Sequence, residues 1–162
     1  MKIAIVGHAQ DKFCALTEGM AKGAIHTIIQ KYLFDGYEEE DFILSGECPM
    51  GGVDIWAHEI ADYLGFTFVP FKPKQNVWDA EYGFKQRNLD MAQTCDVLYN
   101  IVVRNWPKDF TGDKYKDYHC LKHEEMKDHP HVKSGGCWTA WKAKELGKEV
   151  HWIIIDAEEV IV

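Results

Sequence analysis

The sequence predicts an α/β domain in three layers, with helices on both faces of a parallel sheet. Short apolar segments of strand length alternate with longer segments whose apolar residues recur every three or four positions. Glycines stand where these segments change, most densely between residues 45 and 54. Because parallel strands need a crossover between them, the alternation predicts βαβ units with right-handed crossovers.

The first half of the chain predicts three strands separated by two helices. Gly36 and Gly65 are expected to end the helices, because glycine readily takes the left-handed conformation that closes a helix. In chain order the elements are a strand over 2–6, a helix over 12–34, a strand over 42–44, a helix over 53–64 and a strand over 66–71 that Pro70 and Pro73 end. The apolar face expected for the first helix contains Phe13, Leu16, Met20, Ala24, Ile28 and Tyr32, widened by Ile25 and Ile29.

The second half predicts two further strands and two further helices around an irregular insertion. We expect a loop over 74–82, a helix over 83–92, a strand over 96–103, a helix over 134–146 and a strand over 150–155. Residues 104–133 follow no helical or strand period and predict a lid or metal-binding insertion before the last helix. The whole chain, 1–162, is expected to form one domain with a Rossmann-like sheet in the order 3-2-1-4-5.

The composition and net charge of the chain argue against nucleic acids and membranes as partners. Of the 162 residues, 46% are hydrophobic and 27% are charged, which is typical of a folded globular domain. The formal net charge of -8 argues against general binding to nucleic acid, because phosphate backbones are bound by clustered Lys and Arg. No apolar stretch has the roughly 18 residues of a membrane span, and the N-terminal apolar run is shorter than a signal peptide requires. We expect no membrane association and a cytoplasmic location, with the cysteines reduced or bound to a metal.

The stretch Ser45–Asp54 is rich in glycine and joins a predicted strand to a predicted helix. Such turns direct backbone N–H groups at one point, where the helix dipole adds positive potential, so they attract phosphate. A second glycine turn opens at Ser134. In a parallel sheet of this order, ligands bind beyond the carboxyl ends of the strands, where both turns are expected to meet. The expected ligand-binding residues are Gly7, His8, Ser45, Gly46, Gly51, Gly52, Trp78, Asn88, Ser134, Gly135, Gly136 and Thr139, with Arg87 supplying positive charge.

Other interpretations of these residues stay open. Arg87 could form an ion pair on a polar helix surface, and Asp54 could cap a helix or complement its dipole. Trp78 could stack on a base or cover the core. The chain has neither G-x-G-x-x-G after its first strand nor G-x-x-x-x-G-K-[ST], so the standard dinucleotide and P-loop modes of phosphate binding are not expected.

Four motifs, in their order along the chain, resemble the SLOG superfamily of Rossmann-like domains, which is related to the Lonely Guy phosphoribohydrolases and DNA-processing protein A. They are GH after the first strand, SG-x4-GGVD-x-WA at 45–57, QRN-x2-MA at 86–92 and SGG-x2-T at 134–139. The similarity covers nearly the whole chain outside 104–133 and is closest to small members with an R-N motif. It implies a nucleotide or nucleotide-derived ligand, with hydrolysis of the N-glycosidic bond of a nucleoside monophosphate as a candidate activity and a homodimer as a candidate assembly.

The resemblance does not by itself supply a catalytic carboxylate. The Lonely Guy motif P-G-G-x-G-T-x-E-E aligns with residues 134–142, where Trp141 and Lys142 stand at the two glutamate positions. A carboxylate that binds ribose or stabilises an oxocarbenium-like centre must therefore come from elsewhere. The catalytic candidates are Glu47, Asp54 and Arg87, with Glu81 as a further source of a carboxylate.

Histidines and cysteines gather in and beside the insertion. These are the ligand types that zinc prefers, and four of them could complete a tetrahedral site. A metal would also explain how a long irregular segment stays folded. The alternative is a lid whose histidines are solvated or bind phosphate, and Cys137 could instead be reactive, because a helix start favours its thiolate. The candidate metal ligands are His119, Cys120, His123, His129, His131 and Cys137.

Three functional hypotheses follow from the residues and the resemblance. The first is a domain that binds a nucleotide-like small molecule and hydrolyses its N-glycosidic bond, as a nucleoside-monophosphate phosphoribohydrolase does. The second is a non-catalytic nucleotide sensor or sequestering module whose aromatic, histidine-rich insertion closes over the ligand. The third is a metal-stabilised interaction protein with a vestigial pocket.

Overall fold

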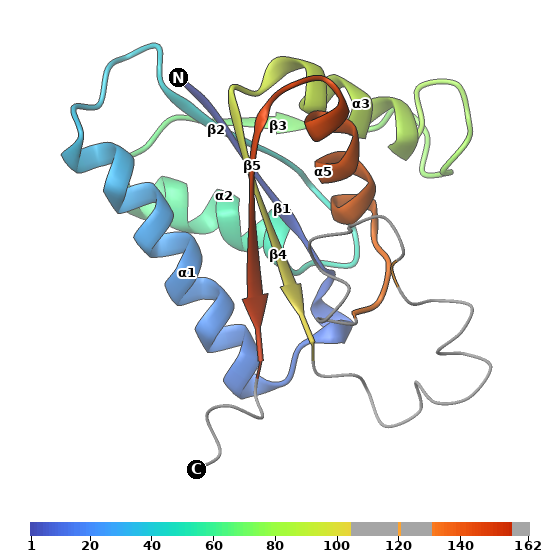
Figure 1. Cartoon of the computed structure of the whole chain (residues 1–162), viewed down its shortest axis with the longest axis horizontal. Helices are drawn as coiled ribbons and strands as arrows, with labels where there is room; N and C mark the ends of the chain where they lie inside the picture. The colour runs from blue at the N-terminus through green and yellow to red at the C-terminus, as the bar shows by residue number, and fades with distance from the viewer. Residues whose placement is uncertain (105–119, 121–130, 157–162) are drawn as a thin grey trace.

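The computed structural model of the chain describes residues 1–104, 120 and 131–156 (Figure 1). In chain order the elements are β1 (Lys2–Gly7), a 3-10 turn (Gln10–Lys12), α1 (Ala15–Phe34), β2 (Phe42–Gly46), α2 (Val53–Leu64), β3 (Phe68–Phe71), α3 (Phe84–Thr94), β4 (Val97–Val103), α5 (Gly135–Glu145) and β5 (Glu149–Ile155). None of the helices in this part of the chain is long and apolar enough to cross a membrane.

The strands form one parallel sheet in the order β3-β2-β1-β4-β5, which confirms the predicted α/β fold and strand order. β1 is the central strand, and Ile3 lies opposite Ile43 of β2 on one side and Val97 of β4 on the other. Helices α1 and α2 cover one face of the sheet, and α3 and α5 cover the other (Figure 1). The order of connections reverses between β1 and β4, so the carboxyl ends of these two strands border the point where such sheets bind ligands.

Alternation along β1 divides the core between the two faces. Ile3 and Ile5 pack with α1 and α2, whereas Ala4 and Val6 pack with α3 and α5. All four side chains are buried, as expected for a strand covered on both faces by helices. Because α3 follows β3 and α5 follows β4 in a parallel sheet, the N-terminal ends of both helices lie near its carboxyl edge.

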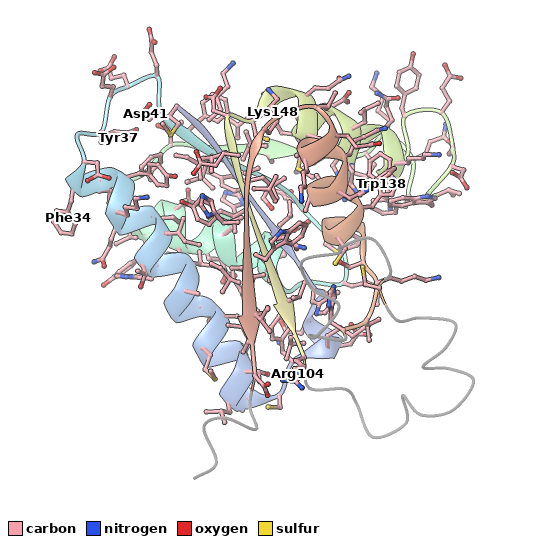
Figure 2. All side chains as sticks on the ribbon, in the orientation of Figure 1. Phe34, Tyr37, Asp41, Arg104, Trp138 and Lys148 are labelled. Atoms are coloured by element: carbon pink, nitrogen blue, oxygen red, sulfur yellow. The ribbon has the colours of Figure 1, made fainter. Side chains whose placement is uncertain are left out.

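α1 buries Ile25, Ile28 and Ile29 of the face that the sequence predicted, and also Thr17 and Ala21, which were not predicted to lie on it. The helix begins at Ala15, after the 3-10 turn, and its buried residues are Thr17, Ala21, Ile25, Ile28 and Ile29. Leu16 is 44% exposed, and Phe34 projects from the far end of the helix (Figure 2). The buried positions are small or β-branched, whereas the larger predicted residues Phe13, Met20 and Tyr32 are partly buried at the margins of the stripe.

The remaining boundaries follow the predicted pattern with small shifts. α2 spans the predicted residues, and Gly65 ends it with a positive φ of 73°. β3 begins at Phe68 and includes Pro70, which was predicted to end the strand. Within the described residues β3 is an edge strand, and proline is tolerated there because only one side of the strand pairs with a neighbour, β2.

Candidate functional site

A small cavity lies at the carboxyl edge of the sheet, where the starts of α2 and α5 meet the start of α3. Its volume is about 110 Å³, and because each water molecule occupies about 30 Å³ of liquid it accommodates only a few waters or a compact anion. We call it the inner cavity. It is lined by Val6, Gly7, Ala9, Cys48, Asp54, Arg87, Asn88, Met91, Ser134, Gly135, Gly136 and Thr139.

Arg87 and Asp54 are the charged residues of the inner cavity. Arg87 comes from the first turn of α3 and Asp54 from the first turn of α2, and both side chains are more than nine-tenths buried. The Arg87 guanidinium donates from Nε to Asn88 Oδ1 at 2.7 Å and from Nη1 to the Phe71 carbonyl at 3.0 Å. These two bonds hold the guanidinium plane in place, so its charge is presented to the cavity in a fixed orientation.

Burial shifts the ionisation of this pair. It raises the pKa of Asp54 from 3.8 to about 6, because the loss of solvation outweighs the attraction of Arg87 and the hydrogen bonds from Ser45 and the backbone of Cys48. Burial also lowers the pKa of Arg87, which Asp54 partly offsets. The cavity therefore holds a guanidinium beside a carboxyl group that takes up a proton near pH 6. Such a carboxyl can accept a hydrogen bond from a sugar hydroxyl or donate a proton.

Two glycines of the Ser45–Asp54 turn leave the space that the Arg87–Asp54 pair and the start of α2 require. A Cβ at Gly46 would stand 2.1 Å from Arg87 Nη1 and 2.7 Å from Asp54 Oδ2, so only glycine leaves room for both side chains. Gly52 precedes α2 with a φ of 90°, and a Cβ there would stand 2.4 Å from the His8 carbonyl. In the glycine-rich stretch Ser45–Asp54, the structure therefore requires glycine at positions 46 and 52.

The second glycine turn forms the opposite wall of the inner cavity. Ser134 caps α5, since its Oγ accepts a hydrogen bond from the Cys137 N–H at 3.1 Å. Gly135 and Gly136 are the first two residues of the helix and line the cavity. Their N–H groups have no acceptor within the helix, because the first turn of any α-helix precedes its hydrogen-bonding partners. Thr139 also lines the cavity, with its hydroxyl donating to the Gly135 carbonyl at 2.7 Å.

A wider and more apolar pocket adjoins the inner cavity. Its volume is about 400 Å³, and we call it the outer pocket. The two share Cys48, Arg87, Asn88 and Gly135, so they meet at the guanidinium. The residues found only in the outer pocket are Pro49, Met50, Asn76, Trp78 and Phe84. The inner cavity and the outer pocket thus form a polar compartment with an apolar compartment beside it.

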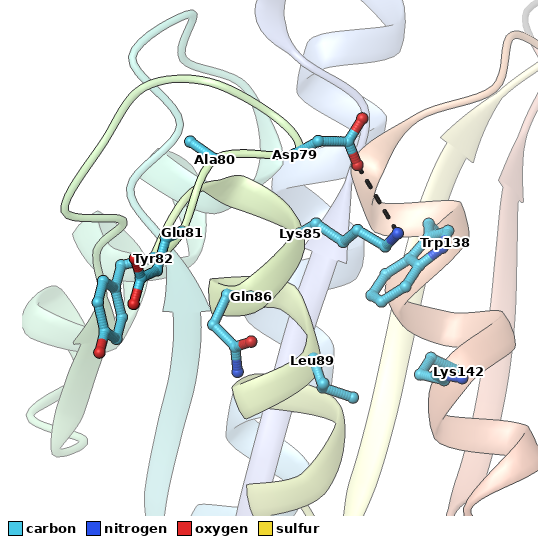
Figure 3. A pocket seen from close by; sticks show the side chains of 9 residues that line it. All are labelled: Asp79, Ala80, Glu81, Tyr82, Lys85, Gln86, Leu89, Trp138 and Lys142. Atoms are coloured by element: carbon cyan, nitrogen blue, oxygen red, sulfur yellow. Dashed lines mark ion pairs between the residues drawn. The ribbon is translucent and has the colours of Figure 1, made fainter.

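A separate cleft of about 770 Å³ lies between α3 and α5, and it shares no lining residue with the inner cavity or the outer pocket. Figure 3 shows Lys85 pointing at Asp79, 3.7 Å away, and Trp138 and Lys142 of α5 facing the α3 side chains. Glu81 lines this cleft, so the structure places that candidate carboxylate apart from Arg87 and Asp54.

Glu47 also lies apart from the inner cavity. Its carboxylate contacts His58 Nδ1 at 3.1 Å and Lys72 Nζ at 2.8 Å, and the residue is not among those that line the inner cavity or the outer pocket. The neighbouring residues Gly51 and Ser45 are likewise absent from both linings. Ser45 Oγ donates to the Ile5 carbonyl at 2.5 Å.

His8 joins three segments of the chain and does not line the inner cavity. It is 1% exposed, Nδ1 accepts the Val103 N–H at 3.0 Å, and Nε2 lies 2.6 Å from the Val132 carbonyl. Nε2 therefore carries the proton, because a carbonyl oxygen can only accept. Burial lowers the pKa of His8 to about 4, so the ring is neutral near pH 7. His8 therefore links the end of β4 to residue 132 through two hydrogen bonds.

Cys120, His131 and Cys137 form a second cluster beside the inner cavity. Their potential ligand atoms all lie within 4.8 Å of one another, so these three residues could hold a metal ion. His131 Nε2 is 3.4 Å from Cys137 Sγ, and Asn100 Nδ2 donates to the same sulfur at 3.6 Å. Burial raises the pKa of the Cys137 thiol well above its ordinary value. The other predicted metal ligands, His119, His123 and His129, lie outside the described residues.

Several residues of the site were not predicted. Cys48 and Met91 line the inner cavity, and Met50, Asn76 and Phe84 line the outer pocket. Cys48 and Met50 stand inside the predicted glycine turn, so their position in that turn was an available signal. Met91 and Phe84 carry no such signal, because apolar residues on a helix are expected to pack in the core.

Comparisons with protein-family models and with curated proteins found no match to this chain. The resemblance to the SLOG superfamily therefore stays a prediction. The arguments for function rest on the geometry of the inner cavity and the outer pocket.

Proposed function

We propose that this protein binds a nucleotide or a nucleotide-derived metabolite, with the phosphate in the inner cavity and the base in the outer pocket. The observation that carries the proposal is the junction of a small charged cavity with an apolar pocket at the buried Arg87. A nucleotide has the same division, since a compact anion is joined through a sugar to a flat aromatic ring. The sheet order supports the location, because it places the junction beside the switch point.

The inner cavity suits a phosphate that is attached to a sugar better than a free anion. Arg87 and the first N–H groups of α5 attract the phosphate. Asp54 opposes a second negative charge but can accept hydrogen bonds from ribose hydroxyls. The anion-binding donors and the Asp54 carboxylate line the same cavity of about 110 Å³. A complementary ligand therefore carries an anion and hydroxyl groups within a few ångströms of one another.

The outer pocket supplies an apolar surface for a base. Trp78, Phe84, Met50 and Pro49 line it, and Trp78 is 36% exposed. Trp78 is held by an edge-to-face contact with Trp138, with ring centroids 5.7 Å apart. An aromatic ring fixed at the edge of a pocket can stack on a base at low entropic cost.

Hydrolysis of the N-glycosidic bond is a second candidate function, and the raised pKa of Asp54 favours it. A carboxyl with a pKa of about 6 is protonated in roughly one molecule in ten at pH 7, whereas an ordinary aspartic acid is almost fully ionised. If the glycosidic bond lies within reach of the inner cavity, Asp54 could donate that proton to the departing base while water adds to the sugar, giving a free base and ribose 5-phosphate. A non-catalytic sensor would use the same pocket and leave the nucleotide unchanged.

Replacement of Arg87 tests the binding proposal. Isothermal titration of the full chain with adenosine, guanosine, cytidine and uridine monophosphates should identify at least one ligand. Arg87→Met should weaken its binding by about 10- to 100-fold, because a charge-assisted hydrogen bond contributes about 1.5–3 kcal/mol. The matched control is Lys85→Met, which removes a positive charge from the separate cleft on the same helix and should leave the affinity unchanged.

Thermal melting keeps this test decisive if Arg87→Met folds poorly. The wild-type chain should melt at a higher temperature with a nucleoside mono-, di- or cyclic phosphate, because a ligand that binds only the native state stabilises it. If none of these compounds raises the melting temperature, or if the Met variants at 87 and 85 bind equally, the proposal is wrong. Chromatography of the mixture after long incubation separates the two candidate functions, since free base indicates hydrolysis and intact nucleotide indicates a sensor.

A further inference from the structure

We propose that Cys120, His131 and Cys137 bind one zinc ion, which joins residue 120 and the segment before α5 to the first turn of that helix. The site would use two sulfurs and one imidazole nitrogen as protein ligands. The fourth tetrahedral position would take water or a further donor. This inference is independent of nucleotide binding, because none of the three ligands lines the inner cavity or the outer pocket.

The positions of the three side chains fit a tetrahedral zinc ion. With Zn–S bonds of about 2.3 Å and Zn–N bonds of about 2.0 Å, ligand atoms in a tetrahedral site stand about 3.5–3.8 Å apart. The three potential ligand atoms lie within 4.8 Å of one another, and His131 Nε2 is 3.4 Å from Cys137 Sγ. Small side-chain movements would therefore bring all three to bonding distance.

The backbone brings the ligands together without help from the metal. The Cys120 N–H donates to the His131 carbonyl at 2.7 Å, which keeps these two residues side by side. The Val132 carbonyl, one residue further, is held by His8. Cys137 is fixed in turn by the Ser134 cap of α5. Because each ligand has its own anchor, little conformational entropy remains to be lost on binding.

The neighbours of the Cys137 sulfur suit the thiolate that forms when zinc displaces the thiol proton. Asn100 Nδ2 donates to its sulfur at 3.6 Å, and the sulfur belongs to the first turn of a helix, where the dipole stabilises negative charge. Two thiolates balance the charge of Zn²⁺, so the loaded site is neutral and tolerates burial. Sulfur with imidazole selects zinc over calcium or magnesium, which prefer oxygen ligands.

Metal analysis of the purified full chain tests the proposal. After incubation with zinc and dialysis, mass spectrometry of the metal should find about one zinc per chain. Cys120→Ser and Cys137→Ser should each lower this value at least fivefold. The matched control is Cys14→Ser, because Cys14 is exposed and stands outside the cluster.

A cobalt titration of the wild-type protein tests the site without relying on variants that could fold poorly. Addition of Co²⁺ to the zinc-free wild-type protein should produce a thiolate-to-cobalt charge-transfer absorption, and stoichiometric zinc should remove it. Less than about half an equivalent of zinc in the wild type would overturn the proposal, and so would equal zinc content in Cys120→Ser and Cys14→Ser.

Discussion

At Gly46, a missing side chain provides the space in which Arg87 and Asp54 meet. The two charged groups come from different helices and are both buried, so neither can move aside into solvent. The Arg87 guanidinium is also bonded to Asn88 and to the Phe71 carbonyl. A single methyl group at position 46 would therefore disturb the whole charged pair.

Gly46→Ala should displace Arg87 and weaken ligand binding, because the new Cβ would stand 2.1 Å from Nη1. We expect a loss of about 1–3 kcal/mol in the free energy of unfolding, as in other overpacked sites. The control is Gly23→Ala in α1, where nothing lies within 4 Å of the added Cβ. That substitution should raise stability by about 0.5–1 kcal/mol, because alanine favours a helix. Urea denaturation measures both, and equal effects would contradict the steric role of Gly46.

At the scale of one element, α1 shows how a helix selects its buried stripe. The helix has apolar residues around much of its circumference, so several stripes are compatible with its sequence. Contact with the sheet decides among them, and it buries Thr17 and Ala21 in the same line as Ile25. Small residues lie where the helix comes nearest to the strands, and larger ones such as Met20 lie at the border.

Substitution of two apolar residues on α1 tests this stripe. Ile25→Ala should lower the free energy of unfolding by about 2–5 kcal/mol, because Ile25 is fully buried and its removal leaves a cavity. Leu16→Ala, on the same helix, should change it by less than about 1 kcal/mol, because Leu16 is 44% exposed. Chemical denaturation measured by circular dichroism gives both values. A larger cost at Leu16 than at Ile25 would contradict the burial seen in the structure.

At the scale of the whole molecule, two buried groups make stability depend on pH in opposite directions. His8 has a pKa of about 4 in the folded chain and 6.5 as its ordinary value, so its contribution is present above pH 6.5 and is lost as the pH falls through 4. Asp54 has a raised pKa of about 6 against 3.8, so its contribution is present below pH 3.8 and is lost as the pH rises through 6. The two effects largely cancel between pH 4 and 6.

Asp54→Asn should remove one of these two opposing effects of pH and leave that of His8. Asparagine keeps the shape but does not titrate, so the variant loses only the contribution of the carboxyl group. Between pH 4 and 7 the free energy of unfolding of the variant should rise by about 2–3 kcal/mol relative to the wild type, since one pKa unit corresponds to about 1.4 kcal/mol. Urea denaturation at a series of pH values measures the difference. A constant difference across this range would show that Asp54 ionises as it does in the unfolded chain.

The order of elements and the sheet topology could be predicted because local patterns carry that information. Ile3 and Ile5 alternate with Ala4 and Val6, so one short segment already predicts a strand buried on two sides. Gly65 marks the end of α2 in the sequence and in the structure. The position of the crevice follows from the same patterns, since a sheet of this order has its switch point at the carboxyl ends of its strands.

The tertiary structure alone decided which polar groups face the crevice. Glu47 and Asp54 belong to one glycine-rich stretch and carry the same charge, so the sequence could not distinguish their roles. His58 and Lys72 hold Glu47 apart from the inner cavity, whereas Gly46 and Arg87 hold Asp54 in it. His8 was expected to bind ligand but is bound by the backbone of Val103 and Val132. Local sequence determines where a side chain is attached, but partners distant in sequence determine where it points, and these contacts exist only in the folded chain.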